Sequence, residues 1–220
     1  MSGELGYLAL LMALVVAALQ AVLPVVGIWR RQESWQQLAP SLAIAQALAL
    51  IVSMGGLMSA FLHNEFSYSY IAGHSNSLMP WYYQISAVWG GHEGSMLLWV
   101  TILGIWSALV AWKGRSLPLS MQARVLSLLG MIQLAMISFV VLTSSPFALS
   151  LPALPVDGAD LNPLLQDPGL IFHPPMLYMA MSVWRCLLPL PWQPCGKAAW
   201  IQHGHAGRGP GRSPPGAFSP

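Results

Sequence analysis

Four long apolar runs dominate this chain, at residues 5–28, 42–62, 95–112 and 125–143. At about 1.5 Å per residue, each run can cross the roughly 30 Å hydrocarbon layer of a bilayer as one helix. Charged residues make up only 7% of the sequence, against roughly 25% in a soluble domain. The pattern predicts an all-α, polytopic membrane protein with four transmembrane helices, in direct contact with membrane lipid.

A fifth apolar run begins near Pro175 but does not reach spanning length. Arg185 and then Pro189, Pro191 and Pro194 interrupt it. Proline inside a helix removes a backbone donor and clashes with the preceding turn. We therefore expect an aborted fifth helix.

Residues 181–220 differ in composition from residues 1–180. Glycine and proline account for 13 of these 40 residues, which is typical of disordered segments. The sequence therefore predicts a membrane part at 1–180 and a disordered tail at 181–220. Our hypothesis is that a frameshift or chimeric end truncates a longer membrane protein near Ala180.

The basic residues indicate how the helices are oriented. Five of them lie in the connections on one side of the expected spans: Arg30, Arg31, Lys113, Arg115 and Arg124. The connections on the other side, 64–94 and 144–178, contain no lysine or arginine. Because basic loops stay in the cytoplasm, we expect the amino terminus and both of these segments on the outer side, which is the periplasmic side of a bacterial inner membrane.

Several other classes of protein are disfavoured. Cys186 and Cys195 are the only cysteines, so the chain has neither a disulfide framework nor a Cys-x-x-Cys-His haem-attachment motif. Its net charge of +2 is not gathered into a basic patch, which argues against nucleic acid as a partner. The first apolar run follows an acidic rather than a basic start, so we interpret it as a retained helix and not as a signal peptide.

His173 is the first candidate for chemistry. Pro174 favours an extended backbone at His173, and Pro175 suits the first turn of a following helix, so His173 is predicted at a helix mouth on the outer side. A neutral imidazole fixed in this way could be an axial ligand of haem iron. Equally, it could cap the helix or contact lipid headgroups. His63, His74 and His92 are possible second ligands without further support.

The segment Trp-Gly-Gly-His-Glu-Gly-Ser at residues 89–95 has two interpretations. As structure, its glycines form a tight turn, and Glu93 or Ser95 caps the third span. As a binding site, the small residues leave room for a flat aromatic ligand against the backbone, with Trp89 for stacking and His92 nearby. The residues alone leave both open.

Three stretches resemble the amino-terminal part of the CcmF family, the large subunit of bacterial cytochrome c maturation haem lyases. They are residues 75–83, residues 89–99 (Trp-Gly-Gly-His-Glu-Gly-Ser-Met-Leu-Leu-Trp) and residues 162–179. The resemblance implies cytochrome c-type biogenesis: haem b is received from the chaperone CcmE and, with CcmH, joined to apocytochrome c at the periplasmic face. It also implies that His173 is an axial haem ligand, with Trp89, His92, Pro174 and Pro175 as its surroundings.

The chain departs from the family pattern in two respects. It has no counterpart of the family's tryptophan-rich Trp-Gly-x-Trp-Trp-x-Trp-Asp segment or of its later histidines. We therefore expect an incomplete copy that is inactive alone as a haem lyase. The alternatives are a nonfunctional fragment and a small transporter-like bundle whose outer histidines relay protons. The span interiors hold glutamines but no ionisable side chains, which disfavours a proton pathway.

Overall fold

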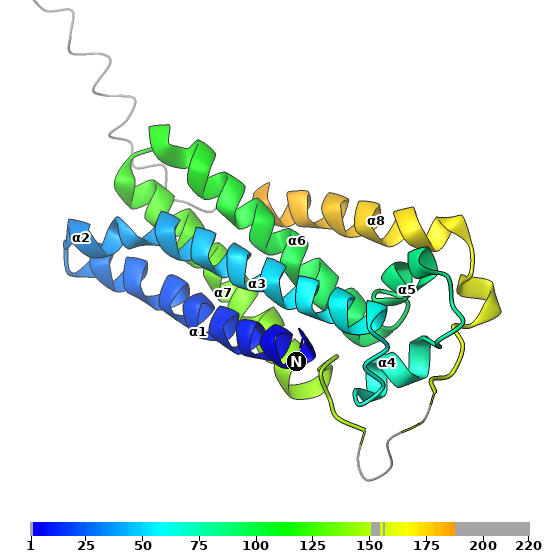
Figure 1. Ribbon diagram of the computed structural model, residues 1–220. Coiled ribbons are helices and arrows are strands. Elements are labelled where there is room, and N and C mark those ends of the chain that lie inside the picture. Colours follow the sequence, from blue (N-terminus) through cyan, green and yellow to red (C-terminus); the bar gives the residue numbers. More distant parts are fainter. Residues whose placement is uncertain (1, 151–154, 156, 188–220) are drawn as a thin grey trace, which may run out of the picture.

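The computed structural model describes residues 2–150, 155 and 157–187, and almost all of its regular structure is helical. Four long helices are apolar enough to cross a membrane, as predicted: α1 (Ser2–Trp29), α3 (Leu38–Leu62), α6 (His92–Lys113) and α7 (Leu119–Thr143). Shorter helices connect them: α2 (Glu33–Gln36), α4 (Ser69–His74) and α5 (Trp81–Ala87). α8 (Pro168–Leu187) follows a long connection (Figure 1).

The long helices run alternately up and down, so the bundle has two chemically different ends. α4, α5 and the start of α1 lie at one end, and α2 and the α6–α7 turn lie at the other (Figure 1). The five basic residues used to predict orientation lie near the end with α2: Arg30 and Arg31 precede α2, Lys113 and Arg115 lie at the α6–α7 turn, and Arg124 lies in the first turns of α7. The end with α4 and α5 is the one predicted to face the outer side, and it is called the outer end below.

Small residues bring α1 and α3 into backbone contact. The buried residues of α1 recur every three or four positions and are mostly glycine and alanine: Gly3, Gly6, Leu10, Ala13, Ala17, Gln20, Ala21, Pro24 and Gly27. A Cβ atom added to Gly56 would lie 2.7 Å from the Cα atom of Gly6. Because no side chain separates the two helices there, they pack at the short distance typical of glycine-rich membrane helix pairs.

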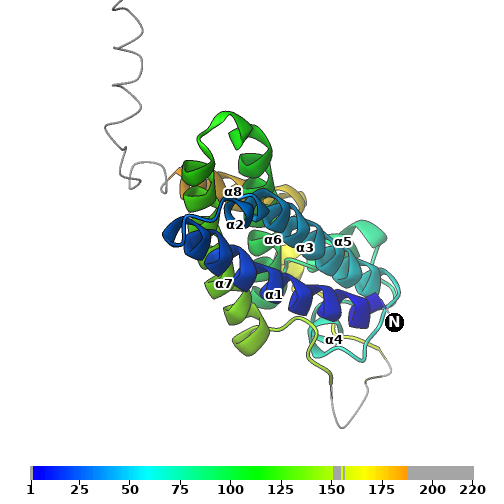
Figure 2. The same cartoon turned by 90° about the vertical axis from the view of Figure 1, so that its left-hand side faces the viewer.

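The other long helices complete the bundle around this pair. α7 packs beside α1 and α6 beside α3, while α8 lies against α6; Figure 2 views the arrangement from the α2 end. Polar side chains are buried between the helices, including Gln20, Gln46 and Gln133. The amide of Gln20 donates to the Leu126 carbonyl oxygen at 2.9 Å.

The last helix differs from the prediction. α8 begins at Pro168 and includes Pro174 and Pro175, so His173 lies inside the helix and not at its mouth. The helix starts early because the Asp167 carboxylate accepts the Gly169 N–H at 2.6 Å, and Pro168 occupies the first helical position, where no N–H is needed.

α8 also crosses the boundary expected at residue 180. It continues to Leu187 and is not among the four helices apolar enough to span a membrane, consistent with an aborted fifth span. The predicted disorder of the tail concerns residues 188–220, which lie outside the described residues.

Candidate functional site

The first turns of α8 are anchored to the body of the protein by two aromatic donors. The indole N–H of buried Trp89 donates to the carbonyl oxygen of Leu170 at 2.7 Å. Pro174, four residues after Leu170, has no N–H to serve that carbonyl. The Tyr83 hydroxyl donates to the Gln166 carbonyl oxygen at 3.2 Å. Trp89 therefore replaces the hydrogen bond that Pro174 removes, which is how the helix tolerates this proline.

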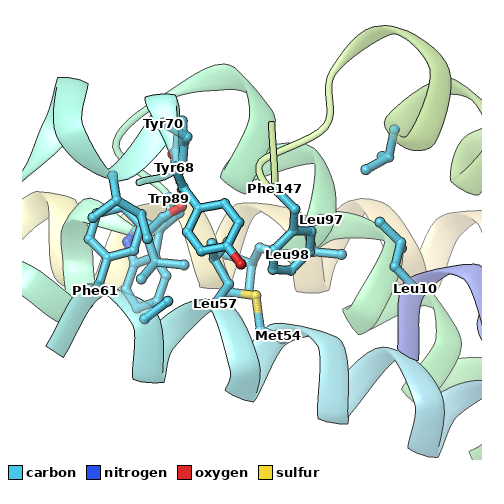
Figure 3. Close-up of a cluster of buried hydrophobic side chains, with 14 of the residues drawn as sticks. Leu10, Met54, Leu57, Phe61, Tyr68, Tyr70, Trp89, Leu97, Leu98 and Phe147 are labelled. Carbon is cyan, nitrogen blue, oxygen red and sulfur yellow. Dashed lines mark hydrogen bonds between the residues drawn. The ribbon is translucent and has the colours of Figure 1, made fainter. Parts of the chain in front are cut away.

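Tyr70 fixes the segment that carries Trp89. Its hydroxyl donates to the Val88 carbonyl oxygen at 2.9 Å and accepts the Gly91 N–H at 3.1 Å. The ring packs edge-on against Phe61, with centroids 5.7 Å apart, and Figure 3 shows these side chains and Trp89 in one apolar cluster. Burial raises the pKa of Tyr70 well above its ordinary value, so its hydroxyl stays protonated and available as a donor.

The glycines of the 89–95 segment make room for protein side chains. A Cβ atom on Gly91 would lie 2.7 Å from both the His74 ring and the Tyr70 ring. A Cβ atom on Gly94 would collide with the Val88 carbonyl oxygen and lie 2.7 Å from the Tyr70 hydroxyl. Space beside these two glycines is thus filled by Tyr70 and His74, which supports the structural interpretation of the segment over a gap for a flat ligand.

The predicted capping of α6 is wrong in detail. The helix begins at His92, with Gly91 as its N-cap and no side-chain capping bond. The Ser95 hydroxyl instead donates to the Trp89 carbonyl oxygen at 2.8 Å, because it lies within the helix and bonds backward to the turn. Ser95 therefore helps to hold Trp89, while Glu93 lies in the first turn, where negative charge is favourable.

His173 is exposed on α8 and lines a cavity of about 460 Å³. The other residues of that cavity are mainly small or apolar: Leu165, Asp167, Gly169, Leu170 and Pro174. Leu170 contributes to this wall and also accepts the Trp89 hydrogen bond. The geometry therefore offers one imidazole beside an apolar surface, attached to a helix start whose backbone is fixed.

The other outer histidines lie at separate places. Nδ1 of His63 contacts the Ser59 carbonyl oxygen at 2.7 Å, and Nδ1 of His74 contacts that of Tyr70 at 2.9 Å. His92 is exposed and lies edge-on to Phe139, with centroids 6.3 Å apart. Within the described part of the chain, no group of three histidine, cysteine or acidic side chains could hold a metal ion. His173 is therefore a single candidate ligand.

Known proteins are similar to this chain in sequence and in fold. A family model described as cytochrome C assembly protein matches residues 89–189. The cytochrome c-type biogenesis protein CcmF of Pseudomonas aeruginosa is 54% identical to this chain over 176 residues, which are 80% of the chain. The chain belongs to the CcmF family.

Further CcmF proteins agree with this assignment. CcmF of Escherichia coli is 43% identical over 181 residues, or 81% of the chain. A solved structure named Cytochrome c Heme Lyase CcmF has the same fold, with a TM-score of 0.69 and 21% identity over 83% of the chain. The chain spans about a quarter of the length of its relatives, 27% of the Pseudomonas protein and 28% of the Escherichia protein.

Sequence reasoning about this CcmF-family chain named Trp89 and His173 as candidate site residues but did not predict the hydrogen bond between Trp89 and the start of the helix that carries His173. Tyr70, Tyr83 and the Leu170 carbonyl were not among the predicted site residues. The signal for the helix start was present in Asp167-Pro168, an N-cap carboxylate followed by a proline. The roles of Tyr70 and Tyr83 depend on contacts between distant segments, for which the sequence carried no local signal.

Proposed function

We propose that this chain takes part in cytochrome c-type biogenesis, by presenting His173 as an axial ligand to haem b at the periplasmic face of a bacterial inner membrane. The observation that carries the proposal is the anchored start of α8, where Trp89 holds the Leu170 carbonyl oxygen at 2.7 Å beside the cavity that His173 lines. Family membership supports it, since the relatives are named cytochrome c-type biogenesis proteins.

The residues around His173 suit one face of a haem. An exposed imidazole is a common iron ligand, and the cavity beside it has leucine, proline and glycine in its wall, which suits a flat apolar ring. A fixed helix start also reduces the entropy lost when the imidazole binds. Bound haem would supply an iron centre, and His173 would hold that iron in place.

Each surrounding residue has a separate task in this proposal. Trp89 sets the position of the α8 backbone, while Pro174 forms part of the cavity wall. Pro175 fixes its own φ angle and so restricts the backbone two residues after His173. His92 remains a candidate neighbour of the haem edge. The second axial ligand, the handover from CcmE, and the joining to apocytochrome c with CcmH belong to the wider assembly.

Haem titration tests the proposal. The full chain in lipid nanodiscs is titrated with haem, and the Soret and reduced α bands are recorded for the wild type, His173→Gly and His63→Ala. We expect the bands of an imidazole-ligated haem in the wild type and in His63→Ala, their loss in His173→Gly, and their return when free imidazole is added to His173→Gly. Unchanged spectra in His173→Gly would overturn the assignment.

A further inference from the structure

A second cavity, of about 380 Å³, lies at the outer end between α4, α6 and the end of α7, and it does not include His173. Most of its lining side chains are polar, and they include Ser69, Tyr70, His74, Glu93, Thr143 and Ser144. We propose that this cavity binds the ammonium group of a primary amine, with Glu93 as the counter-charge. The inference goes beyond the haem-related function and is independent of it.

Charge is the first reason. Glu93 lines the cavity, and no hydrogen bond or ion pair engages its carboxylate within the described residues. The outer segments 64–94 and 144–178 contain no lysine or arginine, so they offer Glu93 no basic partner. A partly buried carboxylate without a partner favours a positively charged ligand, since the attraction is stronger away from bulk water.

The hydrogen-bonding character of the wall is the second reason. Nδ1 of His74 faces the Tyr70 carbonyl oxygen at 2.9 Å. A carbonyl can only accept, so Nδ1 carries the proton and Nε2 of the neutral ring is an acceptor. Nε2 lies beside Gly91, so the acceptors that the wall offers are the Glu93 carboxylate and several hydroxyl oxygens. An ammonium group has three N–H donors and no acceptor, which matches that set.

Other ligand classes fit less well. Metal ions in proteins are held by about four to eight closely placed ligands, and the described residues contain no group of three histidine, cysteine or acidic side chains that could hold one. Anions would meet Glu93 without any lysine or arginine in the lining. The cavity also has room for a short alkyl chain behind the ammonium group, along Val141 and Leu142 of α7.

Two sources could supply this chemistry: a free amine or the headgroup of an amine-bearing lipid. The full chain is prepared in nanodiscs of phosphatidylcholine, which lacks N–H donors, and butylammonium binding is measured by saturation-transfer NMR with butanol as the neutral control. We expect saturable binding of butylammonium and none of butanol. Phosphatidylethanolamine is then added to the nanodiscs: loss of the signal identifies the lipid headgroup, and an unchanged signal identifies a free amine.

Variants test the site itself. Glu93→Gln should weaken butylammonium binding at least about fivefold, whereas Glu4→Gln removes the same charge from the outer end without touching the cavity and should have little effect. Ala148→Leu narrows the cavity without changing its charge and should also weaken butylammonium binding. This variant tests the site if Glu93→Gln does not fold. Absence of saturable binding in the wild type, or equal losses in Glu93→Gln and Glu4→Gln, would overturn the proposal.

Discussion

The carbonyl oxygen of Leu170 accepts the indole N–H of Trp89 at 2.7 Å. In a regular helix this oxygen would accept the N–H of the residue four positions later, but that residue is Pro174, which has none. The single bond from Trp89 joins the segment before α6 to the helix that carries His173. Pro174, which should break the helix, is therefore accommodated by a side chain 81 residues before Leu170 in the chain.

Trp89→Phe tests this relationship. Phenylalanine keeps most of the apolar volume but leaves the Leu170 carbonyl oxygen unpaired, which costs about 1 to 3 kcal/mol. We expect faster amide hydrogen exchange at residues 169–173, measured by mass spectrometry in nanodiscs. Trp81→Phe is the control, because Trp81 is 66% exposed and has no such bond. Equal exchange in the two variants would show that the indole N–H does not hold α8.

Alanine at two glycines should have opposite effects. At Gly94 the new Cβ atom meets the Val88 carbonyl oxygen and the Tyr70 hydroxyl, so Gly94→Ala should lower the free energy of unfolding by about 1 to 3 kcal/mol. At Gly55, inside α3, nothing lies within 4 Å, so Gly55→Ala should raise it by up to about 1 kcal/mol. Thermal unfolding in detergent gives both values. Stabilisation by Gly94→Ala would contradict the close approach.

Replacing two buried glutamines of the bundle by leucine should also have different effects on its stability. Gln46 is fully buried, and neither polar atom of its amide has a partner, so Gln46→Leu should stabilise the bundle or leave it unchanged. The Gln20 amide donates to the Leu126 carbonyl oxygen, so Gln20→Leu should destabilise it by about 1 kcal/mol. Unfolding midpoints measure both variants. A large loss in Gln46→Leu would indicate a bound water on that amide.

Acid should loosen the start of α1. Partial burial alone would raise the pKa of Glu65, but hydrogen bonds from the Ser2 hydroxyl at 2.8 Å and the Gly3 N–H at 3.4 Å lower it below its ordinary value of 4.5. A lowered folded-state pKa means that the contribution is complete above pH 4.5 and disappears as the pH falls through the lower folded-state value. Hydrogen exchange at residues 2–6 against pH measures this, and Glu65→Gln should flatten the curve.

Much of the fold followed from local patterns. Apolar length predicted the four spans, and their starts came out later than in the structure because polar first-turn residues such as His92 and Glu93 lie inside α6. His173 was not predicted to be helical, because a residue before proline disfavours the helical backbone and that rule considers only neighbouring residues. The hydrogen bond that replaces the one lost at Pro174 comes from Trp89, far away in the chain. Likewise, Tyr70 was not predicted as a site residue, although its hydroxyl bonds the Trp89 segment.

The near-touching backbones of Gly6 and Gly56 have a consequence for assembly in the bilayer. Lipid tails are as apolar as leucine, so burying apolar side chains between two helices contributes little free energy of association in a bilayer. What holds this hairpin is close atomic contact along its length, which is available as soon as α1 and α3 have both inserted. The later helices α6 and α7 can then pack against a pair of helices that has already formed.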